Sequence, residues 1–214
     1  MRPISICVLA IVSLAWSVSS QAVLISYGDY SRDTATRLDW LDVDLTAGIS
    51  YDAILGGAGG YIPDGWRYAS GNEIDALATR YIGSPEQTFV GGLDFLQTLL
   101  TIGLLGPTFQ RDLSAEAQAT LATLGYYNDG ASDPNIGLGE FVVTLLVPDP
   151  AFGIPFTGRW STFDNFLAPN TAAPQIGSFL VRSVPEPPML LLILLASAVY
   201  GVWLVASRTA SVRM

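Results

Sequence analysis

Acidic side chains dominate the residues of this chain that could take part in chemistry. The 214-residue sequence holds nineteen Asp and Glu residues, no His, and a single cysteine, Cys7, inside an apolar N-terminal run. The commonest general base and transition-metal ligand is therefore missing, as is any thiol nucleophile in the rest of the chain. Two kinds of chemistry remain, because paired carboxylates hydrolyse glycosidic bonds and clustered oxygen ligands bind Ca²⁺. No motif marks a particular carboxylate pair, so no catalytic residue is assigned.

Two acidic stretches bring several oxygen ligands close together in the sequence. Neither has the twelve-residue loop with a closing Glu that is typical of an EF-hand, and the same residue types are common in solvated turns. Calcium at the second stretch is kept as a hypothesis beside the turn interpretation, and no other cofactor is expected. The ligands are Asp39, Asp42 and Asp44 in the first stretch, and Asp129, Asp133 and Asn135 in the second.

Aromatic residues offer a third kind of site. The segment GRWSTFDNF carries Trp160, Phe163 and Phe166, whose flat faces could stack on sugar rings if they are exposed. Trp66, next to Arg67, precedes a capped helix and is interpreted as a core residue instead. The sequence therefore offers Trp160, Phe163 and Phe166 as a carbohydrate platform.

The charge balance narrows the range of partners. All ten basic residues are arginine, and the net charge is −9. A surface of this sign repels phosphate backbones, which argues against nucleic-acid binding, whereas it keeps a protein soluble and attracts cations.

Both ends of the chain are apolar. Residues 1–22 combine Arg2, an apolar run and small residues before Ala22, the layout of a secretory signal peptide, with cleavage expected after Ala22 or alternatively after Ser19. An uncleaved anchor helix is the alternative. At the other end, residues 189–206 are uncharged and long enough to span a bilayer as a helix, and a buried core helix is the alternative. Arg208 and Arg213 follow this run and predict a cytoplasmic C-terminus.

A short motif precedes the second apolar run. Val184, Pro185, Glu186 and Pro187 stand directly before it, and the prolines prevent a helix from continuing upstream. Motif, apolar run and basic end together resemble the PEP-CTERM sorting signal of Gram-negative bacteria that produce exopolysaccharide. The resemblance implies that an exosortase, a membrane-embedded cysteine protease or transpeptidase, recognises the motif.

The residues between the two ends, 23–183, are predicted to form one extracytoplasmic α+β domain. The pattern predicts an opening strand, a second apolar segment near Trp40, a helix over 51–55 capped by Ser50, and a helix after a Ser70–Glu73 capping box. Residues 91–105 are expected to form a buried helix, and 113–127 a short helix or a strand edge. Strands are expected at 139–148 and 176–182, with a loop over 148–176.

The order of short motifs in this domain resembles a recurrent PEP-CTERM ectodomain. The motifs are Trp40-Leu41-Asp42, Ser50-Tyr51, Gly65 to Ala69, and Gly177 to Arg182. The third is similar to the strand–helix unit of bacterial C-type-lectin-like domains, which implies that the first and last strands pair and bring the termini together.

These observations predict an exported, membrane-tethered and non-enzymatic cell-surface protein. Its precursor is expected in the inner membrane with the ectodomain outside the cytoplasm, and its final place on the cell surface or in a biofilm matrix. The partners expected are signal peptidase and the secretion machinery, an exosortase, membrane lipid, and exopolysaccharide. A calcium- or carbohydrate-binding module is the first alternative, and a glycan-active enzyme with paired carboxylates is the second.

Overall fold

A computed structural model describes residues 22–83, 89–90, 93–111, 118–130, 136–146, 156–164 and 168–185. Its internal contacts divide the chain into one unit that ends at Ser183 and a second that begins at Val184. Apart from Ala22, the predicted signal peptide lies outside the described residues, and so does the predicted span over 189–206. Within the described ranges, no helix is long and apolar enough to cross a membrane.

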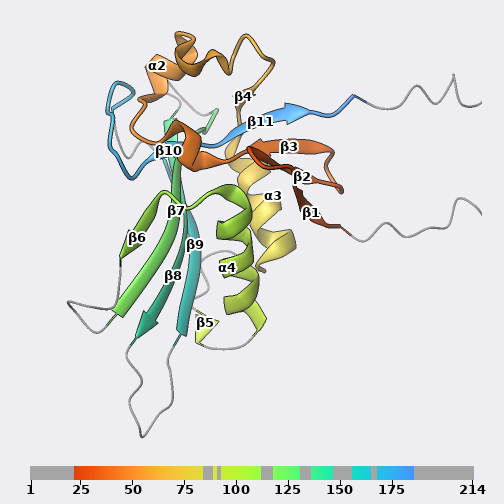
Figure 1. The fold of residues 1–214 in the computed structure, drawn as a ribbon, viewed down its shortest axis with the longest axis vertical. Helices are drawn as coiled ribbons and strands as arrows, with labels where there is room; N and C mark the ends of the chain where they lie inside the picture. Colours follow the sequence, from red (N-terminus) through yellow and green to blue (C-terminus); the bar gives the residue numbers. More distant parts are fainter. Residues whose placement is uncertain are drawn as a thin grey trace, which may run out of the picture. The chain divides into compact units, whose positions relative to one another are not determined.

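The first sheet gathers both ends of the first unit (Figure 1). Its strand order is β1-β2-β3-β11-β4, and every neighbouring pair is antiparallel. The last strand therefore lies between two others, whereas the first lies at an edge. The strands are β1 (Leu24–Ser26), β2 (Tyr30–Asp33), β3 (Leu38–Leu41), β4 (Arg67–Tyr68) and β11 (Leu180–Ser183).

Both faces of this sheet carry buried side chains, because the alternating side chains of its central strands point into two different hydrophobic clusters. Trp40 and Val181, which are opposite each other in register, belong to the larger cluster. Leu41 and Leu180 point the other way, into a smaller cluster that contains Tyr51 and other aromatic residues. The sheet thus separates two small cores.

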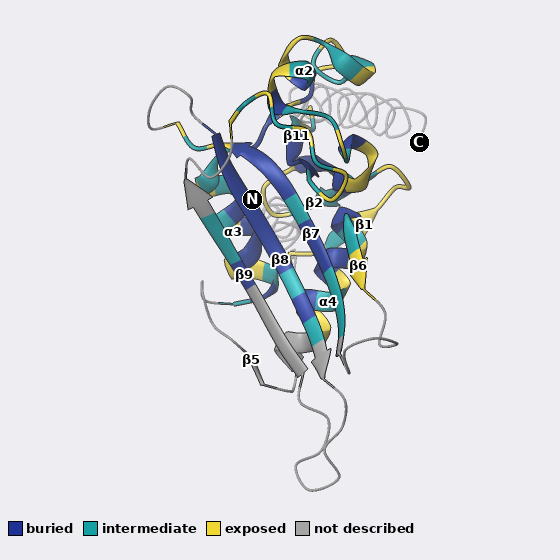
Figure 2. Cartoon of the chain, turned by 90° about the vertical axis from the view of Figure 1, so that its left-hand side faces the viewer, coloured by how far each residue is buried: buried dark blue, intermediate teal, exposed yellow. Residues whose placement is uncertain are grey.

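The second sheet is built around three long strands with the order β10-β7-β8-β9-β5. The helices α3 (Gly71–Tyr81) and α4 (Leu93–Leu105) lie behind it in Figure 2, where the long strands face the viewer. On the covered face, Phe141 and Trp160 are paired in register and belong to the larger cluster. The strands are β5 (Phe89–Val90), β6 (Phe109–Arg111), which pairs with β7, β7 (Gln118–Asn128), β8 (Ile136–Leu146), β9 (Phe156–Asp164) and β10 (Gly177–Ser178).

Local capping fixes the start of two helices. Ser50 Oγ accepts a hydrogen bond from the Ala53 amide, and Ser70 with Glu73 forms a reciprocal capping box, as predicted. Ile74, Leu77 and Ala78 then turn one face of the second helix into the core. The helical elements are η1 (Val43–Thr46), α2 (Tyr51–Leu55), η2 (Ala58–Gly60), α3 (Gly71–Tyr81) and α4 (Leu93–Leu105).

Two glycines permit the close packing of the second sheet against Phe179. A Cβ built at Gly125 or Gly139 would lie 2.9 Å from a ring carbon of Phe179. The absence of a side chain at both positions lets the fully buried Phe179 ring rest against the backbone of β7 and β8.

The mixed α+β class is confirmed, and the described part of the strand predicted at 139–148 belongs to β8. The single last strand predicted at 176–182 is instead two strands, β10 and β11, which pair in different sheets. The loop predicted over 148–176 is wrong for β9, whose residues become a strand by pairing with β8 over nine positions. Residues 118–128 form a full strand rather than a helix. The prediction of a buried α4 is half wrong, because Ile102 and Leu105 are buried whereas Leu96 and Leu100 are exposed.

The expected pairing of the first and last strands is also wrong. β1 pairs with β2, and β11 pairs with β3 and β4. However, Leu24, Asp33, Leu38 and Ser183 stand opposite one another in register and form a single row across the sheet. The two ends of the domain therefore lie at the same side of this sheet without being hydrogen-bonded to each other.

Candidate functional site

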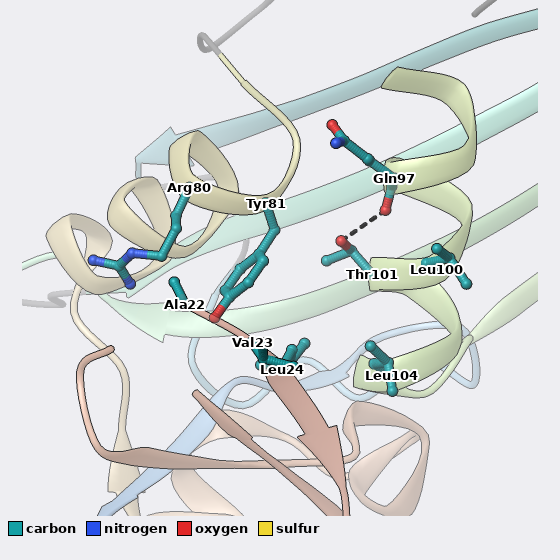
Figure 3. Close-up of a pocket in the computed structure, with 9 residues that line it drawn as sticks. All are labelled: Ala22, Val23, Leu24, Arg80, Tyr81, Gln97, Leu100, Thr101 and Leu104. Carbon is teal, nitrogen blue, oxygen red and sulfur yellow. Dashed lines mark hydrogen bonds between the residues drawn. The ribbon is translucent and has the colours of Figure 1, made fainter. Parts of the chain in front are cut away.

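An open groove of about 330 Å³ lies between the start of the domain, the end of α3 and the helix α4 (Figure 3). Its walls are mostly aliphatic, with the Tyr81 ring on one side and leucines of α4 on the other. The lining residues are Ala22, Val23, Leu24, Arg80, Tyr81, Gln97, Leu100, Thr101 and Leu104.

Asp33 positions the polar side of this groove. Its fully buried carboxylate accepts hydrogen bonds from Arg80 Nη1 at 2.7 Å and from the Tyr81 hydroxyl at 2.8 Å. The Ala35 amide and the Thr36 hydroxyl, in the turn after β2, donate to the same carboxylate. A buried carboxylate with this many donors fixes the last turn of α3 against the β2–β3 turn.

The same contacts keep Tyr81 in its neutral form. Burial raises the pKa of the Tyr81 hydroxyl, and the hydrogen bond to Asp33 and the charge of Asp33 raise it further. Tyr81 therefore stays a hydrogen-bond donor at physiological pH. Because Arg80 is also bound to Asp33, the polar side of the groove carries a compensated pair of charges.

The opposite wall is the outer side of α4. Thr98, Ile102 and Leu105 recur at helical spacing on its buried side, so Leu96 and Leu100 fall on the solvent side. The Ser31 hydroxyl donates to the Leu104 carbonyl at 2.6 Å and holds the end of the helix against β2. The groove is therefore open to solvent, and its aliphatic wall lies beside the polar side chains of Gln97 and Thr101.

The carbohydrate platform predicted at Trp160 is wrong. Trp160 is only 1% exposed and stacks on Phe141 with ring centres 6.5 Å apart, because alternation in β9 turns its ring toward the helices. The side chain of Phe163 and all of Phe166 lie outside the described residues. Trp66 is buried, as predicted.

Of the first acidic stretch, Asp39 serves the fold, whereas Asp42 and Asp44 repel each other. Asp39 binds Arg32 at 2.7 Å and Arg182 at 3.3 Å, so its oxygens are engaged in ion pairs. Across the described ranges, no group of three His, Cys, Asp or Glu residues could hold a metal ion.

The second acidic stretch is only partly visible. Asp129 is half-buried just after β7, whereas Asp133 and Asn135 lie outside the described residues. Calcium binding there stays a prediction.

The predicted sorting motif begins where β11 ends. Val184 is half-buried and Pro185 exposed directly after Ser183, the last residue of the strand. Glu186, Pro187, Arg208 and Arg213 lie outside the described residues.

Sequence reasoning missed an arginine–aromatic cluster on the first sheet. The Arg182 guanidinium lies 4.4 Å from the centre of the Trp66 ring and 5.6 Å from that of Tyr30. Tyr30 stacks on Tyr27, over which Arg32 lies. These rings and cations mainly satisfy one another, so the cluster stabilises the sheet.

The sequence also did not predict the groove, because residues far apart in the sequence form it. Asp33 and Arg80 are 47 residues apart, and no spacing rule links them. The one available signal was the helical period of α4, which distinguishes Leu96 and Leu100 from the buried positions.

In comparisons with known proteins, no family model, no curated protein and no solved structure matches this chain. The resemblance to PEP-CTERM proteins therefore stays a prediction from the motifs.

Proposed function

We propose that this chain is an exported, non-enzymatic cell-surface protein that an exosortase-type enzyme sorts through Val184 to Pro187. Residues 23–183 form the displayed domain, and residues 189–206 hold the precursor in the membrane before the protein reaches the surface or a polysaccharide matrix. The proposal depends on the motifs at the two ends and on how the domain carries those ends.

The observation that most supports this proposal is the position of β11. The strand runs between β3 and β4, and the motif starts with the residue after its last. A membrane tether that continues from Ser183 applies force to a strand that is hydrogen-bonded on both sides. Pulling this strand out of the sheet must therefore break its hydrogen bonds to β3 and to β4 together. Exposed Pro185 also suits recognition by an enzyme.

The common row of Leu24 and Ser183 is further support. Their strands are separated by β2 and β3, so three inter-strand spacings, about 14 Å, lie between them. Figure 1 shows the two strand ends on the same side of the sheet. Such an arrangement suits a domain whose two ends both meet the membrane until the signal peptide is removed.

A C-type-lectin-like architecture is a finer part of the proposal. Ends that lie close together support it. The pairing of β1 with β2, instead of with the last strand, departs from that expectation.

The test replaces Glu186 and Pro187 with alanine in the native host and follows the protein by fractionation and intact-mass measurement. We expect uncleaved precursor to accumulate in the inner membrane. The matched control replaces Pro85 and Glu86, an adjacent Pro and Glu within the ectodomain sequence, with alanine. This control variant should be processed normally. Normal surface delivery of the Glu186→Ala, Pro187→Ala variant would contradict the sorting role.

A further inference from the structure

The groove brings solvent-exposed aliphatic side chains together from two distant parts of the sequence. Val23 is 47% exposed, and Leu96 and Leu100 on α4 are 51% and 64% exposed. Val23 and Leu100 both line the groove, so they share one surface. Scattered single apolar residues are ordinary on a protein surface, whereas a group of them around an apolar hollow indicates a contact site.

This surface lies where the chain enters the domain. Val23 and Leu24 are lining residues, and Leu24 belongs to the row that ends at Ser183. The chain from Ser183 to Met189 spans at most about 20 Å even when fully extended. A span that begins at Met189 therefore keeps Ser183 within about 20 Å of the bilayer. Leu24, about 14 Å from Ser183 across the sheet, is then held at a high effective concentration near the lipid surface.

The chemistry of the groove also fits lipid rather than a charged partner. The transfer of leucine and valine side chains from water into the acyl region lowers the free energy of the system. A tyrosine next to an arginine is typical of the headgroup boundary. Arg80, the one charged side chain that lines the described groove, is paired with Asp33, so the groove presents no unpaired side-chain charge on a chain whose net charge is −9. Apolar contact, and not attraction to anionic headgroups, is the interaction available here.

We propose that the groove lined by Val23, Tyr81, Leu100 and Leu104, together with exposed Leu96 one turn earlier on α4, docks on the bilayer that holds the precursor, with lipid acyl chains as its occupant. This inference depends on the proposed function, because it needs the membrane span. Docking holds the domain in one orientation, with its terminal row toward the membrane and the arginine–aromatic cluster in solvent.

The test uses residues 23–214, the cysteine-free chain expected after removal of the signal peptide, reconstituted in phosphatidylcholine vesicles. A fluorophore is attached through Leu100→Cys in one sample and through Leu55→Cys in a control. Leu55 is a matched choice because it is 52% exposed and lies on α2, whose Tyr51 and Ile54 pack on the opposite face of the first sheet. Brominated phosphatidylcholine then reports contact between each fluorophore and acyl chains.

We expect quenching at position 100 and little at position 55, and we expect Leu96→Ser in the same chain to reduce the quenching at position 100. Equal quenching at the two positions, or none at position 100 in a chain that has entered the vesicles, would overturn the docking inference alone. Failure of the chain to enter the vesicles would instead overturn the proposed function and the inference with it. Self-quenching at position 100 that rises with protein density, without lipid quenching, would overturn lipid as the occupant and assign the groove to a second copy.

Discussion

The two ends of the β2–β3 hairpin carry the same residue type in opposite environments. At the turn, buried Asp33 accepts hydrogen bonds from Arg80 and Tyr81. At the open end, Asp42 faces the negative charges of Asp29 and Asp44, and its buried Oδ1 has no hydrogen-bond partner among the described residues. A carboxylate therefore stabilises this sheet where donors surround it and destabilises it where other acids do.

The environment of Asp42 makes its contribution to the free energy of unfolding depend on pH. Burial, together with the charges of Asp44 and Asp29, raises the pKa of Asp42 to about 6 from an ordinary value of 3.8. A raised folded-state pKa means that the folded state holds this proton more tightly than the unfolded state. The stability that Asp42 contributes is present below about pH 4 and is lost as the pH rises through 6.

The largest expected effect is at the paired end. Asp33→Asn leaves Arg80 without its counter-charge and should lower the free energy of unfolding by about 3 kcal/mol. Urea unfolding of the full chain in mild detergent, followed by tryptophan fluorescence, measures it. Asp64→Asn, at an exposed acid, is the control and should change stability by less than about 0.5 kcal/mol. Equal effects of the two substitutions would show that the Asp33 contacts contribute nothing special.

A smaller effect is expected at Arg182 of β11, which forms an ion pair with Asp39 of the neighbouring strand β3. Arg182→Gln removes the ion pair with Asp39 and the contact with Trp66, and should cost about 1 to 2 kcal/mol. Arg67→Gln breaks a shorter ion pair, in which Arg67 lies 2.6 Å from Glu73. Both side chains of this pair are more exposed than those of Arg182 and Asp39, so a loss of less than about 1 kcal/mol is expected. The same unfolding measurement compares the two. A larger loss for Arg67→Gln would mean that distance, and not burial of the carboxylate, decides the strength.

The smallest effect has the opposite sign. Asp42→Asn removes the repelled charge and should stabilise the protein above pH 6, by about 1 kcal/mol after allowance for solvent screening of a half-exposed group. The gain should fall below pH 6 and level off near pH 4, where the native side chain is protonated. Unfolding curves at pH 4.0, 5.0, 6.0 and 7.5 test the profile, with Asp64→Asn as the reference. A gain that does not change with pH would contradict the proposed repulsion.

Elements with strong local signals were predictable from the sequence. The capped starts of α2 and α3 follow from Ser50, Ser70 and Glu73, because a cap is made within four residues of itself. β8 was predictable from its run of β-branched residues. β9 was missed although Phe156, Trp160 and Phe163 are residues that favour strands, because the surrounding segment has no clear period, and pairing with β8 defines the strand.

The functional features also divide into those that the sequence determined and those that only the tertiary structure decided. The sequence alone determined the charge balance, the missing histidine, the apolar ends and the Pro-Glu-Pro motif, since these are properties of composition and short stretches. Only the tertiary structure decided that Trp160 is a core residue and that Asp33 holds Arg80 and Tyr81 beside α4. Burial and ion pairing depend on which distant segments meet, and the free energy of those contacts becomes available only when the whole chain has folded.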